Sequence, residues 1–433
     1  MKKLLIATSI LISCQAWANN STVNPGASMT MGPSSSSHYI TSGAFNPAMG
    51  SLLVSKDEKV RMSYFPTFGL NTEIGPVDNF ADDLSDLADI IDDPSSTNDD
   101  TQTVLDRFNQ VLVTAGQDGY IKFNVGGNAP LLPVFFYSET LKGTIGFDYS
   151  INGQARVGLL DSELYFDSQK ETFTTASSLY IKSGIEQTFA ISYARMLYET
   201  KVGKLHVGGK FKYIDMELSK QVQPLVELAG LEISDVVRDE YDQNQISSAT
   251  FAVDLGLVWE AENYRLGLTL ENINSPEFNY GEVGVNCSNL AERSTSRTNC
   301  EVAKYFSQTI GVISTNEIHT KHALARVDGL VQVGESVSMF GGIDLAKYDD
   351  ITGDDHQWVH AGVDYQTAWF VLPAMRLAYH KNLTGSETSS LSAGVSLFGV
   401  VSVDVEYGLE SIEIDDSTAP RRLGFAISIQ EQF

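Results

Sequence analysis

The chain has 433 residues and carries 29 Lys and Arg against 55 Asp and Glu, which gives a formal net charge of −26. This excess of acid excludes nucleic acid as a partner, because phosphate binding requires clustered Lys and Arg side chains. The chain contains no HExxH, GxSxG or P-loop sequence, and His360 and His380 lack the Ser and Asn pattern of a lipase. We therefore expect a protein that is not an enzyme and that holds no cofactor and no metal ion.

The first residues predict export. Two lysines precede an apolar run at 4–12 that is too short to span a bilayer, and an Ala-Trp-Ala sequence, typical of a signal peptidase site, follows it. These features predict a signal peptide at residues 1–18. The alternative is a lipobox that ends at Cys14, which would leave that cysteine lipidated. In both cases the chain leaves the cytoplasm.

The mature chain opens with a stretch that cannot form a core of its own. Residues 19–57 begin with many Ser, Gly and other small residues, and they include the sequence Asn46-Pro47-Ala48. Taken alone, Asn-Pro predicts a turn. The segment therefore needs some other structure to enclose it.

Three segments have apolar residues at helical spacing and predict short amphipathic helices. They lie at 77–91, at 104–112 and, after Pro224, at 225–236. Helices of this length in loops between strands would bury their apolar faces by packing. The alternative is an apolar access site for a hydrophobic ligand.

Most of the remaining chain has the two-residue period of β-strands. In the segment 250–259 the odd-numbered positions are apolar and the even-numbered ones are mostly small or polar, and 264–271 repeats this after a turn. Such alternation is typical of strands with one face toward lipid and the other toward an aqueous lumen. The C-terminal third has the same pattern, with Asp404 in mid-strand, where a wet lumen would accept its charge.

The cysteines and one acidic stretch are the remaining candidates for a site. Only Cys287 and Cys300 follow the signal peptide, and in an oxidising compartment we expect them to form one disulfide that closes a loop. A metal or redox role is the alternative. The stretch 349–355 contains four Asp residues around Gly353 but lacks the residue order of an EF-hand, so calcium binding there is only an alternative.

The C-terminus resembles a signal for the outer-membrane barrel assembly machinery. Phe425, Ile427 and Ile429 alternate into a chain that ends at Phe433. Glu431 departs from the pattern, since that signal usually has an apolar or aromatic residue there.

These patterns together predict an all-β fold. Outside the signal peptide no apolar run approaches the ~18 residues of a transmembrane helix, which excludes a helical membrane protein. We expect residues 58–433 to form a transmembrane antiparallel β-barrel of about fourteen strands, surrounded by outer-membrane lipid. A barrel of that size is too wide for wall side chains to fill alone, so another structure should occupy its lumen.

The layout of the mature chain resembles the long-chain fatty acid transporter superfamily of outer-membrane barrels, the FadL-like proteins. Asn46, Pro47 and Ala48 match an Asn-Pro-Ala motif of that family, and Phe433 matches its aromatic terminus. The branch named for conjugal transfer protein TraF is similar in its Gly-rich start and acidic helical loops. The resemblance implies that residues 19–57 form a hatch inside the lumen.

The resemblance also implies passive passage of small hydrophobic molecules through a lateral opening in the wall. Gly126, Gly127, Pro130 and Pro133 are the candidate kink, because proline cannot donate to a strand ladder and glycine weakens pairing. The alternative is that 126–133 forms a turn between two strands. The alternative function is a structural or surface-interaction barrel of the TraF-like family with a plugged lumen.

Overall fold

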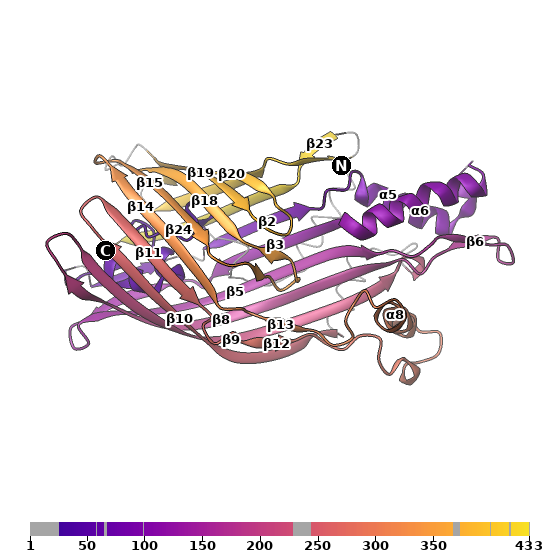
Figure 1. Cartoon of the computed structure of the whole chain (residues 1–433), viewed down its shortest axis with the longest axis horizontal. Coiled ribbons are helices and arrows are strands. Elements are labelled where there is room, and N and C mark those ends of the chain that lie inside the picture. The colour runs from indigo at the N-terminus through magenta and orange to yellow at the C-terminus, as the bar shows by residue number, and fades with distance from the viewer. Residues whose placement is uncertain are drawn as a thin grey trace.

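A computed structural model describes residues 26–57, 59–64, 67–97, 99–227, 244–366, 373–398, 400–414 and 417–432. One antiparallel sheet forms the wall, and it closes on itself because β5 pairs with β8 and β1 pairs with β24 (Figure 1). The sheet contains β1 (Val60–Ser63), β2 (Phe68–Ile74), β3 (Tyr120–Asn128), β4 (Val134–Ser138), β5 (Gly143–Leu160), β8 (Ser178–Glu199), β9 (Lys204–Pro224), β10 (Ile246–Glu260), β11 (Tyr264–Glu271), β14 (Leu324–Val333), β15 (Val337–Asp344), β18 (Trp358–Tyr365), β19 (Ala374–Asn382), β20 (Ser389–Leu397), β21 (Val401–Gly408) and β24 (Arg422–Gln432).

The 16 strands of this sheet occupy fourteen positions around the barrel. Both β1 and β2 pair with β24, so they are two pieces of one wall strand. In the same way β3 and β4 both pair with β5. Subtracting these two shared positions from 16 leaves fourteen, which confirms the predicted barrel.

The apolar and polar residues that alternate in the sequence point to opposite faces of the wall, as predicted. On β10, Phe251, Val253 and Leu255 are 51%, 37% and 48% exposed on the outer face, while Ala252 and Asp254 are buried on the lumen side. An outer apolar face suits hydrocarbon, and a charged inner face suits a lumen.

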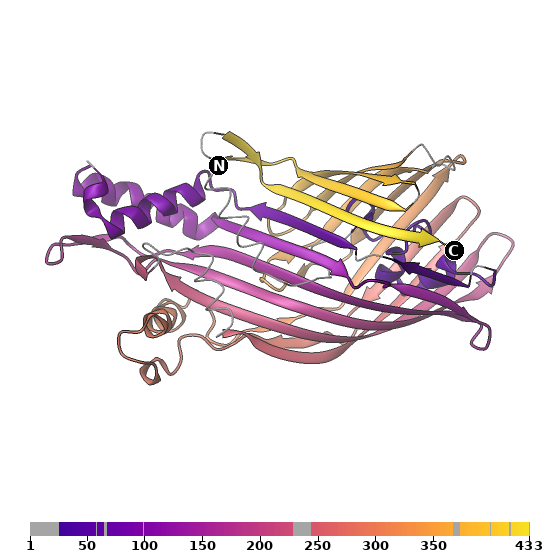
Figure 2. The ribbon, with the colours of Figure 1, turned by 180° about the vertical axis from the view of Figure 1, so that it is seen from behind.

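The two ends of the barrel differ. At one end short turns join β8 to β9, β10 to β11 and β14 to β15, and β24 runs toward this end (Figure 2). At the other end the connections are long and carry helices. Outer-membrane barrels place short turns in the periplasm and long loops outside the cell, which assigns the two ends.

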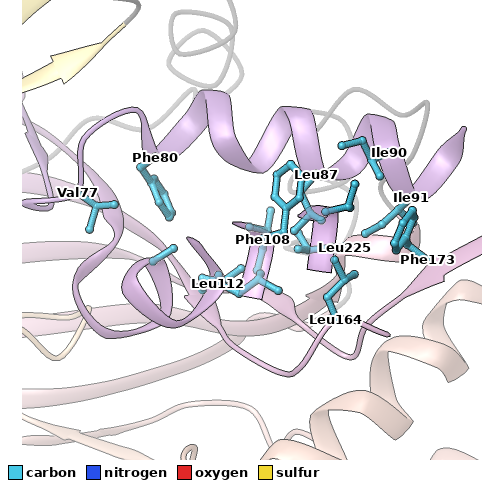
Figure 3. Packing of buried hydrophobic residues seen from close by; sticks show 14 of the residues in the cluster. Val77, Phe80, Leu87, Ile90, Ile91, Phe108, Leu112, Leu164, Phe173 and Leu225 are labelled. Carbon is cyan, nitrogen blue, oxygen red and sulfur yellow. The ribbon is translucent and has the colours of Figure 1, made fainter. Parts of the chain in front are cut away.

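The long loops hold two of the predicted helices, α5 (Phe80–Asp92) and α6 (Thr101–Asp118). Asp100 caps α6 by accepting hydrogen bonds from the backbone N–H groups of Gln102 and Thr103. Apolar side chains of both helices pack with the hairpin of β6 (Tyr165–Asp167) and β7 (Thr172–Thr174), and with Leu159 of β5 and Leu179 and Ile181 of β8, to form a core at the end of the barrel, which we call the crown (Figure 3). The third predicted helix, at 225–236, lies mostly outside the described residues, which include only η3 (Leu225–Glu227) of that segment.

A helix that the periodicity did not predict, α8 (Thr295–Lys304), lies in the loop after β11 and continues into the π-helix η5 (Tyr305–Ile310). A disulfide joins Cys287 to Cys300 in this loop, with the Cα atoms 5.5 Å apart. Among the described residues, no helix is long and apolar enough to cross a membrane. The remaining elements are α2 (Ser28–Met31), α3 (Ser42–Phe45), η1 (Pro47–Met49), α4 (Gly50–Leu53), η2 (Pro94–Ser96), η4 (Cys287–Asn289), β12 (Glu277–Asn279), β13 (Ile318–Thr320), β16 (Tyr348–Asp349), β17 (Asp355–His356), β22 (Ser411–Ile414) and β23 (Ser417–Pro420).

Candidate functional site: the plugged lumen and its interrupted wall

Residues 26–57, which we call the plug, lie inside the lumen. Three wall carboxylates from three different strands hold it. Asp404 on β21 accepts a hydrogen bond from the hydroxyl of Thr30, and Asp328 on β14 accepts one from the backbone N–H of Ser35 at 2.6 Å. Asp364 on β18 accepts a third, from the hydroxyl of Tyr39 at 3.1 Å. The charges that the wall strands carry in mid-strand therefore serve as anchors for the plug.

Wall cations hold the plug from other directions. Arg376 donates to Asp404 at 2.8 Å and to the Tyr39 hydroxyl at 2.9 Å, so it links the wall to the plug. Arg61 donates to the carbonyls of Ser37 and His38 at 2.7 and 2.6 Å. Because side chains make these contacts, the plug can change position without breaking the strand ladder.

The Asn-Pro-Ala motif seats the plug against the wall backbone. The Asn46 side chain accepts a hydrogen bond from the Ala48 N–H at 3.0 Å and donates to the carbonyl of Leu257 at 3.2 Å. Two wall glycines make room for it. A Cβ on Gly256 would lie 2.0 Å from Asn46 Oδ1, and one on Gly208 would lie 2.4 Å from the Pro47 carbonyl carbon. The motif therefore occupies a slot that only glycine leaves open.

Buried ion pairs fill most of the rest of the lumen. Arg326 pairs with Glu271 at 2.5 Å and with Asp344 at 2.6 Å. Arg422 pairs with Glu73 at 3.0 Å and with Glu406 at 2.8 Å. A cavity remains between the plug and the outer loops, and we call it the central cavity. Its lining includes Met29, Phe45, Asn71, Arg326, Tyr348, Trp358, His360, His380, Glu406 and Arg422.

The candidate kink lies where the wall is interrupted. Asn128, the last residue of β3, is paired with Ser150 of β5, and Val134, the first residue of β4, is paired with Phe147. The five residues 129–133 therefore stand opposite only two residues of β5. Both flanking segments pair with the same neighbour, so 129–133 does not join two adjacent wall strands as a hairpin turn would.

Glycine and proline have separate roles at this interruption. Gly126 and Gly127 are buried at the end of β3, and a Cβ on Gly127 would lie 2.4 Å from the Thr67 carbonyl oxygen. Pro130 and Pro133 lie in the looped residues and have no N–H to donate.

On the neighbouring wall strand, β1 ends at Ser63, which pairs with Gln430 of β24, and β2 begins at Phe68, which pairs with Ile427; residues 65–66 between them lie outside the described residues. We call residues 129–133 the wall interruption. Asp148 lies opposite it on β5 and accepts a hydrogen bond from the Asn128 amide at 2.6 Å. A second cavity lies behind, lined by Ala44, Phe45, Asp148, Ser150, Thr188, Ala190, Lys210, Lys212, Asp254 and Glu271. The wall interruption therefore backs onto a mainly polar space beside the plug.

The structure places the remaining predicted residues apart from this site. Phe425, Ile427 and Ile429 lie on β24, with Phe425 39% exposed on the outer face, and Phe433 lies outside the described residues. In the acidic stretch 349–355, which was the alternative calcium site, the ammonium group of Lys122 pairs with the carboxylate of Asp354 at 2.9 Å. A lysine therefore neutralises part of the acidic charge there. In the described part of the chain, no group of three or more His, Cys, Asp and Glu side chains is placed to hold a metal ion.

Sequence reasoning missed contacts that depend on strand register. The hydroxyl of Ser392 on β20 lies 2.8 Å from Nε2 of His380 on β19, although the sequence showed no serine partner for that histidine. Both side chains are buried, so this pair lines the lumen wall. Lys122 was also missed, because nothing near it in sequence signals its partners.

Fold and site define a plugged, fourteen-strand barrel of the outer-membrane type with a local break in its wall. Residues 43–338 match the family described as the F plasmid transfer operon TraF protein, and the chain belongs to that family.

Solved barrel structures are similar to the chain at low identity. The toluene transporter TodX of Pseudomonas putida is 12% identical with a TM-score of 0.46, over 95% of this chain and 98% of that one. A FadL homologue of Pseudomonas aeruginosa is 11% identical with a TM-score of 0.43, over 96% of this chain and 100% of that one. Outer membrane phospholipase A of Escherichia coli is 11% identical with a TM-score of 0.27, over 89% and 98%. No curated protein matches the chain.

Proposed function

We propose that this protein is a passive outer-membrane channel for small hydrophobic molecules, which leave the barrel sideways through the wall interruption. The observation that carries the proposal is the break at 129–133, where five residues stand opposite only two residues of β5. Unpaired backbone groups cost several kcal/mol each in hydrocarbon. The looped residues keep part of their pairing, because the N–H of Ala129 donates to the carbonyl of Tyr149 and the carbonyl of Pro133 accepts from the N–H of Ser63. A barrel with no lateral traffic gains nothing from such a break, whereas a lateral channel needs one.

The position of the plug supports the same function. Phe45 and Ala44 line the cavity behind the wall interruption, so the plug forms one side of the exit path. Gly26, at the start of the plug, packs against Thr67 and against Ser428 of β24. A shift of the plug would therefore alter the space at the break while the fourteen-strand wall stays paired.

Uptake of radiolabelled toluene by cells that display the barrel tests the proposal. Leu131, 53% exposed at the break, is replaced by Cys and alkylated with a bulky polar maleimide. We expect uptake about tenfold faster than in cells without the barrel, and a return toward that baseline after alkylation. The matched control is Leu141→Cys, 52% exposed in the turn between β4 and β5, where alkylation leaves uptake unchanged. A rate of toluene uptake that is the same with and without the barrel, and the same before and after alkylation, would falsify the channel.

The charged lumen favours a second candidate, a structural or surface-interaction barrel whose plug stays closed while its outer loops bind a partner. Buried pairs such as Arg326 with Glu271 and Arg422 with Glu406 leave little apolar surface for a hydrophobic ligand. The net charge of −26 does not favour direct contact with DNA, although the family description names a plasmid transfer operon. This candidate predicts that removal of the crown abolishes partner binding, and that neither the parent protein nor the variant takes up toluene.

A further inference from the structure

The connection between β15 and β18 does not stay on its own side of the barrel. It contains the short hairpin of β16 and β17, and we call residues 348–356 the lid. In the order of wall strands, β15 and β3 are seven positions apart in either direction, so they face each other across the lumen. The lid nevertheless contacts side chains of β3 and β5. It therefore crosses the extracellular half of the barrel.

The far end of the lid is fastened by buried charges. The ammonium group of Lys122 on β3 binds the carboxylate of Asp350 and lies 2.9 Å from that of Asp354. Arg156 on β5 binds Asp354 from the other side, at 3.2 Å. The side chains of Lys122 and Asp350 are only 2% and 1% exposed. These four residues form what we call the latch.

Asp350 also organises the lid itself. Its carboxylate accepts hydrogen bonds from the N–H and hydroxyl of Thr352, from the N–H of Asp354 and from the His356 ring, at 2.8–3.1 Å. Burial opposes ionisation of this carboxyl, but Lys122 and His356 hold its pKa well below the ordinary value. Asp350 is therefore ionised at neutral pH. Loss of the carboxylate would loosen both the lid and its attachment.

The lid is attached to the opposite wall by side chains rather than by a strand ladder. β16 pairs with β17, and the described backbone hydrogen bonds at Asp350 run to Gly353 and Asp354 within the hairpin. Ile351 packs into an apolar cluster with Ile214, Met216 and Tyr280. Detaching the lid would therefore break the latch, the contact between His356 and Lys122 and the packing of Ile351, but no pairing between wall strands.

We propose that residues 348–356 form an extracellular lid over the central cavity, and that release of the latch opens it. Tyr348 of the lid and Met29 of the plug line the same cavity. The cavity is then closed by the plug toward the periplasm and by the lid toward the medium. The nature of the molecule that passes the lid rests on the proposed channel function. The existence of the lid is independent of that function.

Thiol accessibility in intact cells tests the lid. A Cys14→Ser background leaves only the disulfide-bonded cysteines, and Met29→Cys then places one thiol in the cavity. A membrane-impermeant maleimide is added outside, and the labelling rate is measured. We expect slow labelling with the latch intact and labelling at least tenfold faster after Asp350→Asn, since the amide loses the charge that holds Lys122.

Matched variants separate the latch from general disturbance. Asp349→Asn changes the adjacent carboxyl, which is hydrogen-bonded to neither Lys122 nor Arg156, and should leave the rate unchanged. Lys122→Met removes the cation of the latch and leaves Asp350 to hold the lid's internal hydrogen bonds, so it should also speed labelling. Val202→Cys, 73% exposed at the periplasmic turn after β8, shows when the reagent has crossed the outer membrane.

The outcomes are distinct. A heat-modifiable band on a detergent gel establishes that each variant is a folded barrel. Among folded variants, equal rates for Asp350→Asn and Asp349→Asn overturn the lid, as does fast labelling with the latch intact. Faster labelling after Asp350→Asn in a barrel that takes up no toluene would reject the channel and support the lid. Toluene uptake with no change in the labelling rate would support the channel and reject the lid.

Discussion

At the scale of single residues, the plug depends on two close approaches between backbones. Gly256 and Gly208 leave the slot into which Asn46 and Pro47 fit, and a side chain at either glycine would displace the motif. Gly209, next to Gly208 on β9, has no such neighbour, since its nearest atom to a new Cβ is 3.8 Å away.

Gly256→Ala should loosen the plug, because the added methyl would lie 2.0 Å from Asn46 Oδ1. Overpacking of this kind costs about 1–3 kcal/mol. Protease cleavage within residues 26–57, followed by mass spectrometry, should be faster than in the parent protein. Gly209→Ala is the control. Equal protection of the plug in both variants would show that the slot does not hold it.

His319 gives a pH-dependent contribution to the outer loops. It lies on β13 and is 8% exposed. Burial, assisted by nearby Lys321, lowers its pKa to about 4 from an ordinary 6.5. Because the folded loop binds the proton less well than the unfolded loop, this contribution is complete above pH 6.5 and is lost as the pH falls toward 4.

The shift corresponds to about 3 kcal/mol at most. Hydrogen exchange of residues 272–323 should accelerate between pH 7 and pH 4.5, after correction for intrinsic rates. His319→Gln removes the titration, so its corrected protection should vary little over this range. A parent protein with the same flat profile would contradict the assignment.

At the scale of elements, the crown is a second core outside the membrane. Phe108 is 1% exposed at its centre, packed among apolar residues of α5, α6 and the β6–β7 hairpin. The wall beneath it is a closed ladder that does not need those contacts. The two parts should therefore respond separately to mutation.

Phe108→Ala should cost about 3–5 kcal/mol locally, from lost burial and the cavity left behind. We expect rapid proteolysis in residues 78–118 while the heat-modifiable gel shift of the barrel stays unchanged. Val113→Ala, at a position 48% exposed on the same helix, should have no effect. Loss of the gel shift in Phe108→Ala would mean that crown and barrel fold as one unit.

At the scale of the whole molecule, the wall and the plug are held by different forces. Backbone pairing closes the fourteen-strand wall, whereas hydrogen bonds to wall side chains hold the plug. Water entering an unplugged lumen would hydrate the anchors Asp328, Asp364 and Asp404. Removal of the plug therefore need not unfold the wall.

Deletion of residues 26–57 should leave a folded, heat-modifiable barrel with raised ion conductance in planar bilayers. The intact protein should conduct little, because the plug and the lid close the central cavity. Asp349→Asn serves as a folded control with the conductance of the parent. A deletion variant that never reaches the membrane would show that the plug is needed for the wall to form.

The sequence by itself determined the class of the fold. The alternation at 250–259 and 264–271 predicts β10 and β11 with their outward faces, because a strand that separates lipid from a lumen must alternate. Helical spacing likewise predicted α5 and α6. It did not predict α8, whose polar sequence lies in the loop closed by the disulfide.

Only the tertiary structure decided how the site is assembled. Gly126 to Pro133 suggested a kink or a turn, and the choice required the knowledge that β3 and β4 share a neighbour. The partners of Lys122 were hidden for the same reason, since Asp350 lies 228 residues further along the chain. Local periodicity determines which face a residue takes, but barrel closure determines which residues meet across the lumen.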